Sequence, residues 1–261
     1  MSRFNNFKKN ISVIVLVILI INVPLVAFAR PGGGSSGGRG GGGGRSSSSG
    51  GRSSSHSSSR GRSNPIGSIV NLGIFFCMAS GGAIILKVKL SKKKIKSVAA
   101  IKKLSKNDDN WNYKEIKKNI EDAFYNIGIA WMERNQELAK EYMSDKLYDR
   151  HRIKTDWMEV RKEKNILEKM TLLGGTPIGL KDYEGTNKDS LWVHIKAKSI
   201  DYTINEETNK VIDGKNYKSV YYEEYWKFIR VKDRWIVDEI KQIDDIDDIE
   251  FFEIEINDEN Y

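Results

Sequence analysis

Four residues in the C-terminal half of the chain have side chains that can transfer a proton, namely His194, Asp201, Tyr202 and Glu224. Such a group acts as a general acid or base only if it reaches a bound substrate within hydrogen-bonding distance. His194 stands between two apolar residues of a predicted strand, so its side chain is expected on the opposite face, in a structural or solvent-facing position. These residues alone therefore do not predict an enzyme.

Other motifs for catalysis or cofactor binding are weak or missing from the sequence. His151 lies between two arginines and is expected on an exposed helix surface. Gly174-Gly175 predicts only a turn, because one glycine pair has almost no specificity as a nucleotide-binding signal. Cys77 is the one cysteine, which excludes an internal disulfide and a cysteine-based zinc site. We expect no catalytic residue, no metal and no cofactor.

The formal net charge of +8 is concentrated in separate parts of the chain. Nine lysines and no acidic residue lie between Lys87 and Lys106, whereas nine acidic residues and no basic one lie between Asp244 and Glu259. A uniformly basic protein would suggest nucleic-acid binding. This distribution indicates two oppositely charged segments instead of one basic surface.

The first 65 residues do not predict a folded domain. Residues 1–29 join a basic start to an aliphatic run and to Ala27-Phe28-Ala29, which is the pattern of a signal peptide cleaved after Ala29. An uncleaved first membrane helix is the alternative, because the apolar run is just long enough to span a bilayer. Residues 30–65 are rich in Gly, Ser and Arg and are expected to form a disordered linker, with an RNA-binding Arg-Gly tract as the alternative.

Residues 66–86 are 21 positions without a charge and predict a transmembrane helix. Gly73, Cys77 and Gly81 are spaced four apart, a stripe of small residues through which two such helices could self-associate. The lysines that follow are expected to stay in the cytoplasm. The predicted location is therefore the cell membrane, with one span after signal cleavage or two without it, and with the C-terminal domain in the cytoplasm. This topology puts the linker and the lysines on opposite sides of the membrane and argues against nucleic-acid binding.

The basic segment 87–110 is predicted to lie at the membrane surface. Its apolar residues recur at roughly helical spacing among the lysines, so it is expected to contact anionic lipid headgroups, at about 1 kcal/mol per lysine near the surface. An ordinary stop-transfer flank is the alternative. The expected contact residues are Lys87, Lys89, Lys92, Lys93, Lys94 and Lys96.

Residues 111–243 predict an α+β domain that begins with three helices. Apolar residues at helical spacing predict the first, and a short second helix is expected over 136–143. Ser144 is a candidate N-cap for the third, which is expected to run to about Asn165. The residues expected to face inward are Ile116, Ile120, Ala123, Phe124, Ile127 and Trp131 in the first helix, and Leu147, Ile153, Trp157 and Val160 in the third.

The rest of this domain predicts consecutive antiparallel strands. A first strand is expected after Lys169 and is interrupted at Thr176-Pro177, since proline cannot donate in a ladder. Further strands are expected over 191–204, 220–231 and 234–242, with turns at Asp213-Gly214 and Lys232-Asp233. The predicted architecture is three helices packed on one face of a curved antiparallel sheet.

Three stretches of the domain resemble a known family. They read FYNIGIAWMERNQELAKEYMSDKLYDRH, KNILEKMTLLG and EEYWKFIRVKDRWIVDEI. They are similar to the Tim44-like domain of bacterial membrane-anchored proteins, which belongs to the cone-shaped NTF2-like superfamily. The resemblance implies a concave sheet around a deep apolar pocket, association with a membrane, and a scaffold or ligand-binding role. Nothing matches the targeting presequence and motor-binding regions of the mitochondrial relative, so no import-motor role is carried over.

Aromatic residues of the strands are candidates for lining the implied pocket. Alternation along a strand places Tyr222, Trp226 and Phe228 on one face. The candidate pocket residues are Trp192, Tyr222, Trp226, Phe228 and Trp235, with an ordinary core position as the alternative for each. The predicted function is a non-catalytic, membrane-tethered binding or scaffold domain for a lipid, a protein segment or another apolar ligand. The alternative is an NTF2-like enzyme with an acid or base in the cavity.

Residues 244–261 mix acidic and apolar side chains. A solvated, disordered tail is the simpler expectation. The alternative is that this segment folds back on the lysines as an autoinhibitory strap, or docks to a partner protein, because the numbers of opposite charges match.

Overall fold

The computed structural model describes the backbone of residues 65–183, 188–246 and 248–256. Side chains are described from Ile85 onward within these ranges, except at position 244. The predicted signal peptide and almost all of the predicted linker lie outside the described residues, as do the side chains of Gly73, Cys77 and Gly81.

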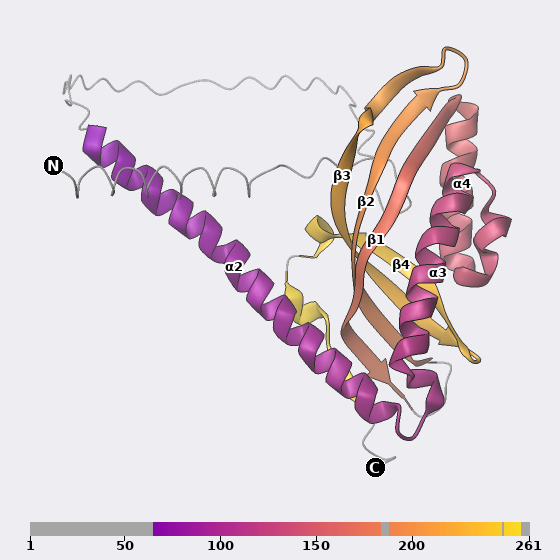
Figure 1. Ribbon diagram of the computed structural model, residues 1–261, viewed down its shortest axis with the longest axis horizontal. Coiled ribbons are helices and arrows are strands. Elements are labelled where there is room, and N and C mark those ends of the chain that lie inside the picture. The colour runs from indigo at the N-terminus through magenta and orange to yellow at the C-terminus, as the bar shows by residue number, and fades with distance from the viewer. Residues whose placement is uncertain (1–64, 184–187, 247, 257–261) are drawn as a thin grey trace, which may run out of the picture.

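The first described element is a single long helix, α2, which spans Pro65–Leu104. It joins the predicted membrane segment to the basic segment without a break, and its N-terminal part projects away from the rest of the molecule (Figure 1). Within the described part of the chain, no helix combines the length and the apolar composition needed to cross a bilayer. Most side chains of residues 66–86 lie outside the described set, so the transmembrane helix stays a prediction.

The helix predicted first in the domain is confirmed as α3, Tyr113–Met132, with all six predicted inward residues buried. Asn112 caps it by accepting bonds from the backbone N–H groups of Lys114 and Glu115. Two 3₁₀ helices lie on either side, η1 at Asp109–Trp111 and η2 at Gln136–Tyr142. The second matches the short helix expected over 136–143.

The next helix, α4, spans Asp145–Val160, and its predicted N-cap is confirmed because Ser144 Oγ accepts from the N–H of Leu147. It ends before Asn165 because Arg161 caps it and Lys162 takes a positive φ of 55°. The predicted inward face is wrong beyond Leu147. Ile153, Trp157 and Val160 are 51%, 59% and 69% exposed. The buried residues are Leu147, His151, Thr155 and Met158.

His151 is therefore buried, not exposed as predicted. Its ring lies edge-on to Trp131 at 5.3 Å between centroids. The buried residues of α4 follow the helical period and include two polar side chains, His151 and Thr155. The apolar residues Ile153, Trp157 and Val160 have the same spacing but lie on another face of the helix. Hydrophobicity alone therefore favoured the wrong one of two helical faces.

Five strands form one sheet in the order β4-β3-β2-β1-β5. The strands β1 to β4 pair antiparallel with their neighbours, and β5 pairs parallel with the edge of β1. Their bounds are Glu163–Asp182 for β1, Ser190–Asn205 for β2, Lys210–Val231 for β3, Arg234–Gln242 for β4 and Ile254–Ile256 for β5.

Two predicted breaks in the strands are wrong. Thr176-Pro177 lies within β1, which accommodates the proline at an irregularity in register between Pro177 and Gly179. Gly214 lies within β3 and the hairpin turn falls earlier, at residues 206–209. The φ of Gly214 is +74°, and a Cβ there would lie 2.4 Å from the carbonyl oxygen of Asp201. The glycine therefore permits a bulge in the strand instead of ending it.

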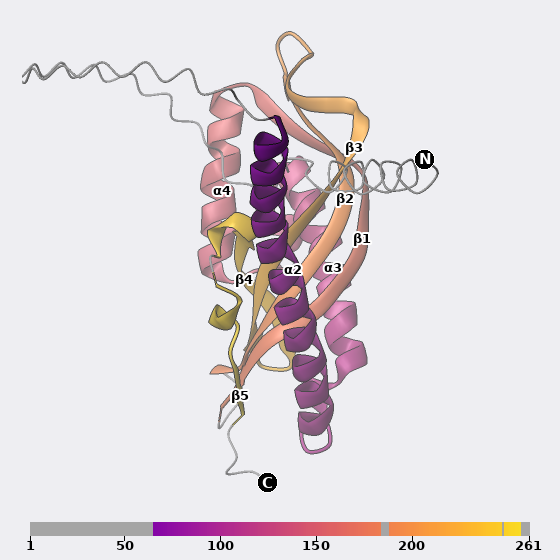
Figure 2. The ribbon, with the colours of Figure 1, turned by 90° about the vertical axis from the view of Figure 1, so that its left-hand side faces the viewer.

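The sheet curls between two layers (Figures 1 and 2). The helices α3 and α4 cover its concave face, and α2 runs along its outer face together with the C-terminal segment. Ser97, Ile101 and Leu104 of α2 are buried against the domain, and so are Ile249 and Phe252 near the C-terminus. The packed unit is therefore wider than the predicted range 111–243 at both ends.

Candidate functional site

The concave face holds four of the five candidate pocket residues, but they are packed together with the helices. Tyr222, Trp226, Phe228 and Trp235 belong to the main hydrophobic core. The cavity beside them has a volume of about 10 Å³, enough for roughly one water molecule. Its lining residues are Phe124, Gly128, Leu167, Met170, Tyr222, Glu224 and Trp226. The deep pocket that the resemblance implies is thus filled by side chains at this place.

The fifth candidate, Trp192, lies on the other face of the sheet. It pairs across the strands with Lys227, whereas Val193 pairs with Trp226, so the two tryptophans point to opposite sides. Trp192 joins a second, smaller cluster with Ile178, Tyr225, Ile249 and Phe252. The prediction that one cavity unites Trp192 with Trp226 is therefore wrong.

The four candidate acid–base residues are held apart by separate partners. The carboxylate of Glu224 accepts bonds from Trp226 Nε1 at 2.9 Å and from Gln242 Nε2 at 3.1 Å. Asp201 accepts a bond from Asn165 Nδ2 at 2.9 Å, and the Tyr202 hydroxyl donates to Glu168 at 2.6 Å. His194 lies on the outer face, paired with Tyr225. Glu224 lines the small cavity on the concave face, so the sheet separates it from His194.

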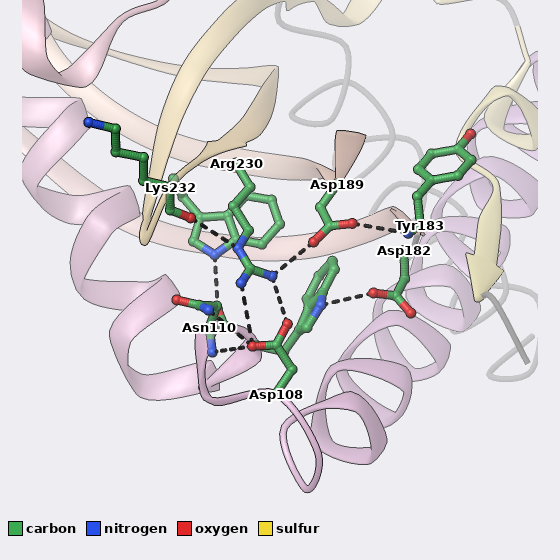
Figure 3. A network of polar contacts seen from close by, with 9 residues as sticks. Asp108, Asn110, Asp182, Tyr183, Asp189, Arg230 and Lys232 are labelled. Carbon is green, nitrogen blue, oxygen red and sulfur yellow. Dashed lines mark hydrogen bonds and ion pairs between the residues drawn. The ribbon is translucent and has the colours of Figure 1, made fainter. Parts of the chain in front are cut away.

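A buried charge network joins the end of α2 to the sheet (Figure 3). Arg230, which is 2% exposed, places Nη1 2.7 Å from Asp108 and 2.9 Å from Asp189. Burial raises the pKa of Asp189, and the bonds from Tyr183 and Arg230 offset this only in part. The network fixes the loop after α2 and hence the position of the helix.

Two tryptophan side chains reinforce the same junction. Trp111 and Trp235 pack with their ring centroids 4.9 Å apart. Trp111 Nε1 donates to Asp182 at 3.1 Å, and Trp235 Nε1 donates to the carbonyl of Asn110 at 3.0 Å. Trp235 therefore serves the attachment of α2 to the sheet, not the lining of a pocket.

The outer face carries an open groove between α2 and β1. Its volume is about 470 Å³, and only apolar atoms line its surface. The lining residues are Lys94, Ile95, Val98, Ala99, Lys102 and Thr176. Ile95 is 72% exposed, and Lys92, Lys96 and Lys103 of the same helix are exposed as well. The groove therefore combines exposed apolar side chains with lysines of the same helix.

The six lysines predicted to contact the membrane divide into two groups. Lys87, Lys89, Lys92 and Lys96 are exposed. Lys93 and Lys94 are half-buried and turn toward the domain, where Lys93 Nζ lies 2.9 Å from Glu250 and burial lowers the pKa of Lys94. This division could not be read from composition, because it depends on which side of α2 meets the sheet.

A titratable cluster lies under α2 next to the groove. His194 Nε2 is 2.5 Å from Glu223, and Lys196 Nζ is 3.2 Å from the same carboxylate. Burial lowers the pKa of His194, and Glu223 counters this only in part, while Lys94 from α2 and Lys196 add to the lowering. The bond from His194 lowers the pKa of Glu223 to about 2. A neutral His194 beside an ionised Glu223 agrees with the direction of both pKa shifts.

This cluster predicts that stability falls below pH 6.5. His194 takes up its proton at a lower pH in the folded protein than its ordinary value of 6.5, so below that pH the unfolded chain binds more protons. The slope is at most about 1.4 kcal/mol per pH unit for one group. Replacing His194 with Gln should reduce the difference between urea midpoints at pH 7.5 and 5.5. An unchanged difference would contradict this assignment.

The C-terminal segment also belongs to the outer face. Of the two expectations for it, the fold-back onto the lysines is the one observed for residues 248–256. Phe252 is fully buried and its ring lies 4.7 Å from that of Tyr225. Sequence reasoning did not identify Phe252 as a core residue. The sequence feature that could have indicated its burial is the recurrence of apolar residues among the acidic ones.

Fold and site together define a small α+β domain whose described outer face offers an apolar groove and charged side chains. The family described as "Tim44-like domain" matches residues 97–242, which is more than half of the chain, and the chain belongs to this family. Members are generally membrane-associated binding or scaffold domains without enzymatic activity. The match begins at Ser97, the residue at which α2 becomes buried.

No curated protein matches the chain. A similar solved structure is described as "Crystal structure of intermembrane space region of chloroplast protein ARC6". The two share 9% identity with a TM-score of 0.35, over 48% of this chain and 95% of that chain. A likeness at this level carries no functional argument.

Proposed function

We propose that this chain is a non-catalytic binding or scaffold protein that is tethered to the cell membrane through residues 66–86 and holds its Tim44-like domain on the cytoplasmic side. The exposed lysines that directly follow this stretch, Lys87, Lys89 and Lys92, lie against anionic lipid headgroups, and the groove along α2 begins just beyond them. The observation that supports this most is the continuity of α2, which carries the uncharged stretch 66–86 directly into the groove-lining residues Ile95, Val98 and Ala99.

The charges of this surface favour an anionic lipid over a neutral one. Lys87, Lys89 and Lys92 are exposed, and the helix carries them no more than about 9 Å beyond residue 86. A lysine near an anionic membrane surface contributes about 1 kcal/mol, and the effect falls off within a Debye length of about 8 Å at physiological ionic strength. The surface should therefore discriminate by headgroup charge and lose that preference in high salt.

Lysine reactivity on the full chain tests this arrangement. With the chain reconstituted in vesicles, Lys87, Lys89 and Lys92 should be acetylated about fivefold more slowly in anionic than in neutral lipid, which corresponds to about 1 kcal/mol per site. Mass spectrometry of peptides reads out each position, and 0.5 M salt should remove the difference. Lys114, Lys117 and Lys118 of α3 are exposed and serve as matched controls without protection.

Two outcomes would contradict the proposal. Equal protection of these three α2 lysines and of the α3 lysines would mean that the start of the basic segment does not lie at the membrane surface. Labelling of the α2 lysines in intact cells by an impermeant reagent would place the domain outside the cytoplasm.

A further inference from the structure

The edge of the sheet at β1 is covered by the chain's own C-terminal segment. Leu180 pairs with Ile254, and the backbone N–H of Leu180 donates to the carbonyl of Glu253 at 2.9 Å. A Cβ at Gly179 would lie 2.8 Å from this carbonyl and 3.1 Å from Cβ of Phe252. The glycine thus leaves room for an extended backbone to run beside β1.

An aromatic socket receives one side chain of this segment. Phe252 is fully buried, with its ring 4.7 Å from Tyr225 and 5.5 Å from Trp192. The neighbouring Phe251 is half exposed and packs on the rim, 5.4 Å from Trp192. A single buried aromatic anchor surrounded by partly exposed contacts is how many peptide-binding sites concentrate their affinity.

Lysines on both sides of the socket match acidic residues of the segment. Lys93 of α2 places Nζ 2.8 Å from the carbonyl of Phe252 and 2.9 Å from Glu250. On the other side, Lys181 of β1 lies 2.7 Å from Glu253 and 2.8 Å from Glu255. These bonds raise the pKa of Lys181 and keep it charged. Because the acidic partners are exposed, each ion pair contributes little binding free energy. The two lysines instead make the site prefer an acidic segment over a basic one.

The segment is attached as a covering strand and not as a central part of the sheet. Its strand has three residues, lies at the sheet edge and pairs parallel, while the other described strands are longer and antiparallel to their neighbours. An uncovered sheet edge is a template for a strand from another chain. A covering segment held in cis competes with such a strand at an effective concentration in the millimolar range.

We propose that the edge of β1, the socket at Trp192 and Tyr225, and the flanking Lys93 and Lys181 form a docking site for an extended acidic peptide of a partner protein. The partner peptide carries an aromatic anchor followed by alternating acidic and aliphatic residues, as in Phe252–Ile256. The chain's own segment Ile249–Ile256 closes the site until the partner peptide displaces it. The proposal does not depend on attachment to a membrane.

Cutting the chain in front of the segment tests the proposal. In the full-length chain, a protease recognition sequence replaces Asp247, and cleavage leaves the segment bound by non-covalent contacts alone. A fluorescein-labelled peptide of residues 248–256 is then added to the cut and the uncut chain, and its anisotropy is measured. We expect saturable binding to the cut chain, at least tenfold weaker binding to the uncut chain, and at least tenfold weaker binding of a peptide with Phe252→Ala.

Two glycine variants distinguish a loss of peptide binding from a loss of folded structure. Gly179→Ala in the cut chain should reduce peptide binding at least tenfold, because the new methyl group meets the peptide backbone. Gly174→Ala on the same strand is the control, since a Cβ there meets no atom within 4 Å. Far-UV circular dichroism should show the native signal for both variants.

Four results would overturn the proposal. The first is equal binding of the peptide to cut and uncut chains, and the second is a cut chain that neither releases nor exchanges its own segment. The third is loss of the circular dichroism signal when the segment is removed, which would make it an integral part of the fold. The fourth is a dimer of the uncut chain that disappears with Gly179→Ala, which would assign the site to a second copy.

Discussion

Replacing Arg230 with Met is expected to lower the free energy of unfolding by about 3–5 kcal/mol, because it leaves the buried carboxylate of Asp189 without its partner. The same change frees Asp108 and so loosens the loop after α2. Urea unfolding of the full chain, followed by tryptophan fluorescence, measures the difference.

The matched control is Arg234→Met four residues further along. Arg234 also forms an ion pair, with Glu141 at 2.8 Å, but both side chains are 56% exposed. An exposed pair contributes about 0–1 kcal/mol, so this variant should unfold almost like the parent chain. Similar losses for the two variants would show that burial of the Arg230 network is not what stabilises the junction.

Replacing Phe228 with Ala is expected to cost about 3–5 kcal/mol of stability, the usual range for emptying a fully buried aromatic position. Phe228 is fully buried in the main core, with its ring centroid 6.5 Å from that of Trp226. If this part of the concave face were a preformed ligand pocket, removing a lining side chain would enlarge it at little cost.

Tyr221→Ala on the same strand provides the comparison for Phe228. Tyr221 is 63% exposed, and an exposed substitution usually changes stability by no more than about 0.5 kcal/mol. Urea unfolding of both variants in the same buffer distinguishes the two situations. A loss of less than 1 kcal/mol for Phe228→Ala would argue for open space where the structure shows packing.

Elements with a long hydrophobic pattern on one face could be predicted from the sequence. The helix α3 has an apolar residue at nearly every inward position, so its presence and its buried face could be predicted. The long strand β2 and the tight turn between β3 and β4 were likewise predictable from β-branched residues and from Lys232-Asp233. The family resemblance then gave the concave sheet with helices on one face.

Errors arose where tertiary contacts decide between two local patterns. On α4 the buried stripe includes His151 and Thr155, which bury polar groups against Trp131 and Gln136. No hydrophobicity pattern favours such residues over Ile153 and Trp157. Asp213-Gly214 predicted a turn, because the sequence does not distinguish the positive φ of a bulge from that of a hairpin turn.

The outer face was the part least accessible to prediction. Trp192 and Tyr225 could be assigned to a strand face only once the register of β2 and β3 was known. Phe252 looked like part of a solvated tail, because acids outnumber apolar residues over 244–261 as a whole. The exposed edge that β1 would otherwise present was the physical reason to expect a covering strand, and only the sheet order reveals that edge.

The continuity of α2 has a mechanical consequence. A helix of 40 residues extends about 60 Å and has no joint along its length. Ile101 and Leu104 anchor its last turns in the core. This contact sets the direction of the helix axis, and the side of the helix on which each residue lies, as far back as Pro65. One extra residue near Val88 would turn everything before it by about 100° about the axis. Any structure that holds the N-terminal end of α2 in a fixed orientation therefore also fixes the orientation of the sheet.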